Sequence, residues 1–271
     1  MTIAPVRGRL LVPVAIVALT LSTSAAASTP APESIDSDHD GITDATEREL
    51  GFDPHHVDIP EPLLFDMVRG LGARKGELEA NVLAYGALGS FPALRGGPEL
   101  EWVFEKGYGF EVELPVSTTF GVEACKAAVQ GTLPAGGATA FSHGWLAMGE
   151  YLFGGPGGRG TATYIAAVRF DARWSALAMI GGSVTHHRRR SPRPRAAGVF
   201  NPSVFFDASA YVTLGVELNS ILEDDGTTDL VVLPQVHWQP NRSWKIQLGS
   251  GAQIDDLGMN LFSALRVSFM Y

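Results

Sequence analysis

The stretch that decides the fold ends the chain and reads Leu265-Arg266-Val267-Ser268-Phe269-Met270-Tyr271. Every second residue of this stretch is large and apolar, and the residues between them include Arg266 and Ser268. Because successive side chains of a strand point to opposite faces, this period of two predicts a β-strand with one apolar face.

The same period recurs upstream, for example at Leu100, Trp102 and Phe104 and at Val212, Leu214 and Val216. It predicts about twelve strands. Many have 10 to 13 residues, more than the usual five or six of soluble sheets and enough to cross a bilayer at a tilt, which takes about 9 to 11. The predicted strands are 76–86, 98–106, 108–117, 120–132, 141–153, 160–170, 174–186, 196–206, 209–220, 229–238, 243–254 and 259–271.

The connections between these strands alternate in length. Those at 106–109, 171–173, 207–209 and 240–242 are short, whereas 86–98, 154–160, 187–197 and 221–229 are longer, and 134–140 is an exception on the short side. Aromatic residues flank the short turns, as in an interfacial girdle. We therefore predict an all-β fold, an antiparallel transmembrane β-barrel over residues 75–271. A secreted β-sandwich with its apolar face inward is the alternative.

The final strand, ending on Tyr271, resembles the carboxy-terminal signature of Gram-negative outer-membrane β-barrels. The resemblance implies location in the cell outer membrane, contact with its lipid and lipopolysaccharide, and recognition of the last strand by the barrel assembly machinery. There is also a distant likeness to transporter-like barrels, but no residue motif carries their substrates over.

The N-terminus has the three parts of a secretory signal peptide, which we place at residues 1–27. Arg7 and Arg9 precede an apolar run at 10–21, and small residues follow at 24–27. The N-terminal segment of the mature chain is thus expected in the periplasm. Residues 28–60 form a linker and an acidic motif, and 61–74 form a connector or a short helix.

The acidic motif has the spacing of a twelve-residue calcium loop. Oxygen ligands fill every required position, Gly41 supplies the turn, and the exiting helix is predicted to begin at Asp44. The predicted ligands are Asp36, Asp38, Asp40, the carbonyl of Ile42, Asp44 and Glu47. With the following Gly51 and Asp53-Pro54, the motif resembles thrombospondin type 3 and dockerin-like, EF-hand-like repeats, which implies Ca²⁺ as a ligand. The alternative is a solvated acidic linker.

Charge and composition narrow the remaining functions. A formal net charge of −9 argues against nucleic-acid binding, and the single cysteine, Cys125, excludes an internal disulfide. His143 and His237 lie in no Gly-x-Ser-x-Gly or His-x-Ser-Asn-Gly motif, so no enzymatic activity is expected. Residues 188–195 carry a basic cluster that either contacts lipopolysaccharide phosphates or is merely solvated.

The phase of the strands makes a prediction for the barrel lumen. If Leu100, Trp102 and Phe110 face lipid, a set of carboxylates must face inward, with Arg169, Lys245 and Arg266 as the only inward cations. Such a wall predicts a wet, cation-selective pore. The predicted function is a passive channel or transporter for small solutes; the alternative is a non-transporting structural or adhesion barrel whose loops bind an external partner. The predicted wall consists of Glu77, Glu79, Glu99, Glu101, Glu111 and Glu113.

Overall fold

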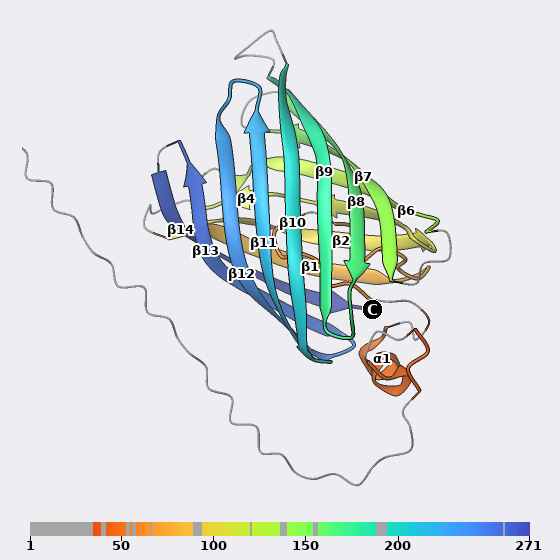
Figure 1. The fold of residues 1–271 in the computed structure, drawn as a ribbon. Helices are drawn as coiled ribbons and strands as arrows, with labels where there is room; N and C mark the ends of the chain where they lie inside the picture. The colour runs from red at the N-terminus through yellow and green to blue at the C-terminus, as the bar shows by residue number, and fades with distance from the viewer. Residues whose placement is uncertain are drawn as a thin grey trace, which may run out of the picture. The chain divides into compact units, whose positions relative to one another are not determined.

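The computed structural model describes residues 35–271 except for 39–41, 53–54, 56–57, 66, 89–93, 120, 136–139, 154–156, 188–193 and 257. The proposed signal peptide, Asp40, and residues 188–193 of the basic cluster therefore lie outside the described residues. The described chain forms one helix and fourteen strands (Figure 1). They are α1 (Asp44–Leu50), β1 (Leu78–Leu88), β2 (Arg95–Glu105), β3 (Tyr108–Glu113), β4 (Val116–Ser117), β5 (Gly121–Val122), β6 (Ala124–Leu133), β7 (Phe141–Leu152), β8 (Gly157–Arg169), β9 (Trp174–His187), β10 (Arg195–Ser209), β11 (Val212–Glu223), β12 (Thr228–Asn241), β13 (Trp244–Asp255) and β14 (Gly258–Met270).

Twelve of these strands form a closed antiparallel barrel. Each long strand pairs with its neighbours along the chain, β6 follows β3, and β1 pairs with both β2 and β14 to close the sheet. The prediction of about twelve strands and of an all-β antiparallel barrel is confirmed. The predicted strands 108–117 and 120–132 are each divided in the structure, the first into β3 and β4 and the second into β5 and β6; β4 pairs with the start of β2 at Gly96 and β5 pairs with β4.

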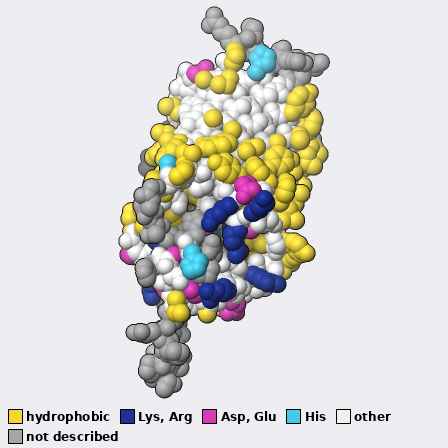
Figure 2. Space-filling model, turned by 90° about the vertical axis from the view of Figure 1, so that its right-hand side faces the viewer, with side chains coloured by type: hydrophobic (Ala, Val, Ile, Leu, Met, Phe, Trp, Pro, Cys, Tyr) yellow, Lys and Arg dark blue, Asp and Glu magenta, His cyan; other side chains and the backbone are white. Residues whose placement is uncertain are grey.

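The barrel wall alternates between an apolar outer face and a largely polar inner face. Along β2 and β3 the exposed residues include Leu100, Trp102 and Phe110, while the residues between them are buried. Hydrophobic side chains form a band on the face shown in Figure 2, and the Lys and Arg side chains gather below it. An exterior of this kind suits contact with lipid, because large apolar side chains cover it.

Among the described residues, no helix has both the length and the hydrophobicity needed to span a membrane.

The helix α1 begins at Asp44, as the calcium-loop spacing predicts. Thr43 caps its N-terminus by accepting a hydrogen bond from the Thr46 N–H, and Gly51 ends it with a left-handed φ of 88°. The helix docks at one end of the barrel, where the Gln239 side chain of β12 donates to the Leu50 carbonyl over 3.1 Å. This end also carries the short turns between the long strands.

Residues 58–74 run through the inside of the barrel, and we call this segment the plug. None of its described residues is helical, so the segment is a connector from α1 to β1 and not the short helix that was the alternative for 61–74. Its apolar side chains pack against inward-facing residues of β1, β6, β7, β8, β9, β10, β12 and β14. An irregular segment can lie at this depth only because the barrel shields it from lipid.

Candidate functional site in the barrel lumen

Apolar side chains of the plug complete the core of the barrel in two places. Leu63, fully buried, packs with Leu83, Leu233 and Phe262 of the wall. Phe65, Met67 and Val68 pack on the opposite side in a second cluster. The wall residues of that cluster are Ala128, Leu146, Ile165, Ala167, Leu177, Met179 and Phe205. The lumen along the plug is therefore filled by protein.

Wall glycines make room for three of the plug's apolar side chains. A Cβ on Gly109 would lie 2.7 Å from Val68 Cγ1, and one on Gly144 would lie 2.8 Å from Leu71 Cδ2. A Cβ on Gly249 would lie 3.0 Å from Leu63 Cδ2. At Gly109 the plug is the nearest neighbour of the added Cβ, whereas at Gly144 and Gly249 wall atoms lie nearer, the Gly131 carbonyl oxygen at 2.4 Å and Leu233 Cγ at 2.7 Å. A larger residue at Gly109 would therefore push against the plug, and one at Gly144 or Gly249 against both wall and plug.

Polar wall side chains bind the main chain of the plug. The Glu217 carboxylate of β11 accepts hydrogen bonds from the N–H groups of Leu63 (2.8 Å) and Leu64 (3.1 Å). Gln130 of β6 accepts from the Val68 N–H and donates to the Arg69 carbonyl. These bonds supply the partners that buried backbone groups require outside regular secondary structure.

Further wall-to-backbone bonds hold both ends of the plug. Gln247 of β13 donates to the Glu61 carbonyl over 3.1 Å, and Arg169 of β8 donates to the Asp58 carbonyl. At the other end, Thr132 of β6 accepts from the Gly72 N–H over 2.9 Å. Wall strands on several sides of the barrel thus fix the position of the plug.

Arg69 of the plug meets the acidic side of the wall. Its guanidinium pairs with Glu79 and lies 3.9 Å from a carboxylate oxygen of Glu101 and 3.4 Å from one of Glu77. Glu61, in the same plug, lies 3.9 Å from Arg69 and 2.7 Å from the Lys245 ammonium of β13. The plug therefore supplies a cation to the acidic side and an anion to the basic side.

A second ion-pair cluster lies on β2, β3 and β6. The Lys126 ammonium pairs with Glu113 and lies 3.1 Å from Glu111, and all three residues are buried. Glu99, Glu111 and Glu113 are close enough together to be considered as a metal site. Among the described residues, they form the one cluster of at least three Asp, Glu, His or Cys side chains whose possible ligand atoms all lie within 4.8 Å of one another. Because Lys126 already neutralises two of these carboxylates, we interpret the cluster as ion pairing and not as a metal centre.

The predicted lumen wall needs a correction. Glu79, Glu99, Glu101, Glu111 and Glu113 do face the interior, but their exposed fractions are 0–9%, so the prediction that they line a wet pore is wrong for this structure. Glu77 lies just before β1, at the barrel mouth, and is partly exposed.

The set of inward cations was also incomplete. Lys126 shares the inward phase of Ala128 and Gln130, so the alternation of β6 could have identified it. Arg69 lies in a segment without periodicity, and no local pattern placed it in the lumen. The predicted wall has more acidic than basic side chains, and this imbalance was the signal in the sequence that further cations face the lumen.

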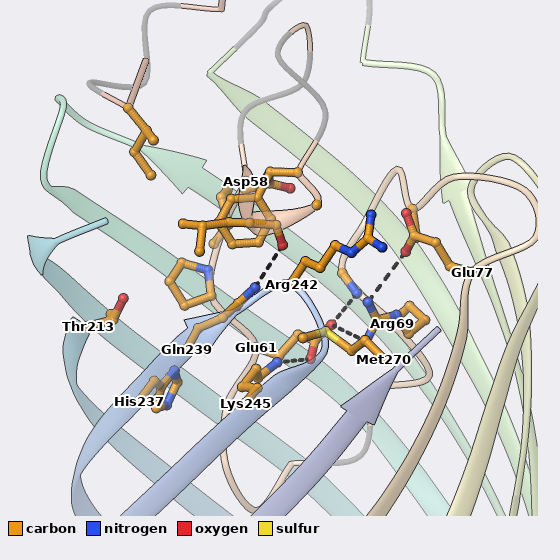
Figure 3. A pocket seen from close by; sticks show the side chains of 18 of the residues that line it. Asp58, Glu61, Arg69, Glu77, Thr213, His237, Gln239, Arg242, Lys245 and Met270 are labelled. Carbon is orange, nitrogen blue, oxygen red and sulfur yellow. Dashed lines mark hydrogen bonds and ion pairs between the residues drawn. The ribbon is translucent and has the colours of Figure 1, made fainter. Parts of the chain in front are cut away.

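A cavity of about 650 Å³ lies next to the plug, at the end of the barrel where α1 docks; we call this end the barrel mouth. It is bounded by the C-terminal end of α1, both ends of the plug and the strand ends near Gln239 and Arg242 (Figure 3). Glu61, Arg69 and Lys245 line it, so the ion pairs of the plug border free space. The plug therefore has room on one side.

The predicted calcium ligands that the structure describes are buried or half-buried. Asp38, Asp44 and Glu47 are buried, Asp36 and Ile42 are half-buried, and Asp40 lies outside the description. Asp44 accepts hydrogen bonds from the N–H and hydroxyl of Ser37. Burial raises the pKa of Asp44, but these bonds and Arg48 outweigh it and hold the pKa below its ordinary value. The donor set is the oxygen-only set that Ca²⁺ prefers.

The two histidines examined for catalysis have structural partners. His143 contacts the Tyr164 hydroxyl at 2.9 Å and the Pro134 carbonyl at 3.2 Å, and its ring stacks on Phe141. His237 is buried between Gln235 and Gln247. Hydrogen bonds hold both imidazole rings in place, and His143 is also held by ring stacking.

Fold and lumen together define a closed, twelve-stranded antiparallel β-barrel with an internal plug, and solved porins share this fold. The KdgM porin aligns with a TM-score of 0.55 and 10% identity, covering 70% of this chain and 98% of the porin. The NanC porin aligns with a TM-score of 0.56 and 8% identity, covering 71% and 98%. A KdgM structure in complex with disordered oligogalacturonate aligns with a TM-score of 0.52 at 10% identity, covering 72% and 98%. At these identities the likeness shows the fold.

In sequence, residues 55–133 match the family model described as HAEPLYID-like. The matched interval covers the plug and the wall from β1 to β6, including Arg69 and Lys126. No curated protein matches the sequence.

Proposed function

We propose that this protein is an outer-membrane channel for small solutes that is closed at rest by its own plug. The observation that carries the proposal is the seating of residues 58–74 inside a barrel of porin type. The apolar exterior supports a membrane location, and the likeness to porins supports passage through the lumen. The plug end carrying α1 faces the periplasm in this proposal.

The kind of contact that holds the plug is compatible with its movement. Its described residues belong to no strand of the sheet, and side-chain hydrogen bonds, ion pairs and apolar contacts hold them, together with one backbone hydrogen bond from the Gly107 N–H to the Ala73 carbonyl at the exit of the plug. The 650 Å³ cavity adjoins it on the mouth side. Opening therefore requires loss of side-chain contacts while the barrel's own strand pairing stays intact.

Single-channel recording on a wall variant tests the proposal. In Gly109→Ala the new Cβ would lie 2.7 Å from Val68 Cγ1, so we expect the plug to be unseated and openings to appear where the wild-type protein is silent. Adding Val68→Ala removes Cγ1 and leaves the Val68 Cβ 3.6 Å away, so the double variant should be silent again. Gly160→Ala is the control, because no atom lies within 4 Å of its Cβ.

Two results would count against this gate. A wild-type protein that conducts as readily as Gly109→Ala would mean that the plug does not close the lumen. Silence of all variants, with a heat-modifiability gel showing folded barrels, would favour a non-transporting structural or adhesion barrel. The buried ion pairs are the observation that favours this second function, since they give the lumen a solid core.

We also propose that residues 36–47 bind Ca²⁺ on the periplasmic side. The completeness of the ligand pattern and the helix beginning at Asp44 support this site.

Glu47→Gln removes one carboxylate charge and the expected bidentate ligand, so calcium affinity should fall at least about tenfold. Glu49→Gln, on the exposed face of the same helix, should leave it unchanged. Calorimetry of the full-length protein measures both; absence of calcium heat at millimolar concentration in the wild type would refute the site.

A further inference from the structure

The wall recognises the plug mainly through atoms that every peptide has. Glu217, Gln130, Thr132, Gln247 and Arg169 all bond to plug N–H or carbonyl groups. Of these side chains, Glu217 and Gln130 bind two main-chain groups each. Recognition of main-chain groups with side chains in separate recesses is how proteins bind extended peptides.

The recesses select apolar side chains at fixed spacing. Leu63 lies against Gly249, Val68 against Gly109 and Leu71 against Gly144. Each recess is open because the wall residue has no side chain. An occupant therefore needs apolar groups at these positions but no particular apolar residue.

The charge of the wall selects a cation between these apolar groups. Glu79 and Glu101 are buried next to Arg69, and Glu99, Glu111 and Glu113 share Lys126 nearby. When the plug leaves, Arg69 leaves with it, so Glu79 and Glu101 lose this cation, while Lys245 on the other side loses Glu61. The acidic side of the wall then attracts a positively charged side chain.

We infer that the lumen is a binding site for extended peptides that carry a basic side chain among spaced apolar side chains. The plug occupies this site at rest, and an incoming peptide of the same chemistry occupies it once the plug is displaced. The inference rests on the proposed function, because an occupant enters only when the plug moves. It assigns the channel a class of solute that its main-chain contacts and its acidic wall both favour.

A cleavable form of the full chain tests this site. A protease recognition sequence is inserted between Lys75 and Gly76, where both residues are exposed, and the protein is cut after folding. The plug then stays seated by non-covalent contacts alone. A fluorescent synthetic peptide of residues 58–74 is added in excess, and its anisotropy and the release of the N-terminal fragment are followed together.

Matched peptides distinguish specific binding from nonspecific adsorption. The 58–74 peptide, and one with the apolar residues exchanged among Leu, Ile and Met, should both bind saturably. A peptide with Arg69→Glu should bind at least about tenfold more weakly, because it brings a carboxylate to Glu79 and Glu101. Equal binding of the Arg69→Glu peptide or of a scrambled peptide would overturn the inference. So would failure of every peptide to bind after the fragment has left.

Conductance of the same cleaved sample separates this inference from the proposed function. Increased conductance without peptide binding retains the channel and overturns the peptide site. Peptide binding without any change in conductance retains the peptide site and overturns the channel. If the cut fragment stays seated, cleaved Gly109→Ala protein supplies the vacated lumen, and the peptides added to it carry Val68→Ala, which fits beside the new Cβ.

Discussion

Replacing Lys126 by Met should destabilise the barrel by about 3 to 5 kcal/mol, the usual effect of breaking a buried ion pair. The side chain of Lys126 is 2% exposed and its ammonium neutralises Glu111 and Glu113, which stay buried in the variant. Removing the ammonium leaves like charges close together at a desolvated position. The midpoint of urea unfolding, followed by tryptophan fluorescence in lipid vesicles, measures the loss.

Lys75→Met is the matched control for this prediction. Lys75 also pairs with a glutamate, Glu105, over 2.8 Å, but their side chains are 63% and 59% exposed. Exposed pairs contribute at most about 1 kcal/mol, so its unfolding midpoint should hardly change. Adding Glu111→Gln and Glu113→Gln to Lys126→Met should restore part of the stability. If Lys75→Met and Lys126→Met lower the unfolding midpoint equally, or if the glutamine substitutions restore no stability, then Lys126 does not stabilise the barrel by neutralising buried carboxylates.

Reversing the charge of Arg69 should expel the plug. Arg69→Glu places a carboxylate beside Glu79 and Glu101 and removes one of the two cations near Glu61. Loss of a buried pair is worth about 3 to 5 kcal/mol, and each 1.4 kcal/mol changes a population about tenfold. We therefore expect the displaced state to become at least about tenfold more populated.

Cysteine labelling measures this displacement. Met67→Cys, placed in a Cys125→Ser background, puts a thiol at a plug position that is 3% exposed. A maleimide should label it at least about tenfold faster with Arg69→Glu than without it. Arg74→Glu is the control, because Arg74 lies at the exposed exit of the plug and pairs with Glu77. If both arginine variants label at the wild-type rate, the ion pairs of Arg69 do not hold the plug.

The barrel could be predicted from the sequence because its signals are local. Each strand carries its own alternation, and the lipid-facing side chains, such as Trp102 and Leu214, repeat every second residue. The helix α1 was predictable for a similar reason, since Thr43 and Gly51 cap it within a few residues. The division of the predicted strands 108–117 and 120–132 was missed, because strands of two residues such as β4 and β5 are too short to show a period of their own.

The plug could not be predicted because its partners are distributed over the whole wall. Its backbone is bonded by Gln130, Arg169, Glu217 and Gln247, which lie on different strands. An irregular segment has no repeat that would mark which of its residues are buried. For this reason the lumen was expected to be wet, although five of its six predicted carboxylates are covered.

The position of the plug in the chain has a consequence for folding. The plug precedes every strand, yet its hydrogen bond to Glu217 joins residues 154 positions apart and that to Gln247 joins residues 186 positions apart. Contacts so remote in sequence form slowly, because a long loop of chain must first close. We therefore expect the plug to acquire its full set of contacts only after β11 and β13 have joined the sheet, late in folding.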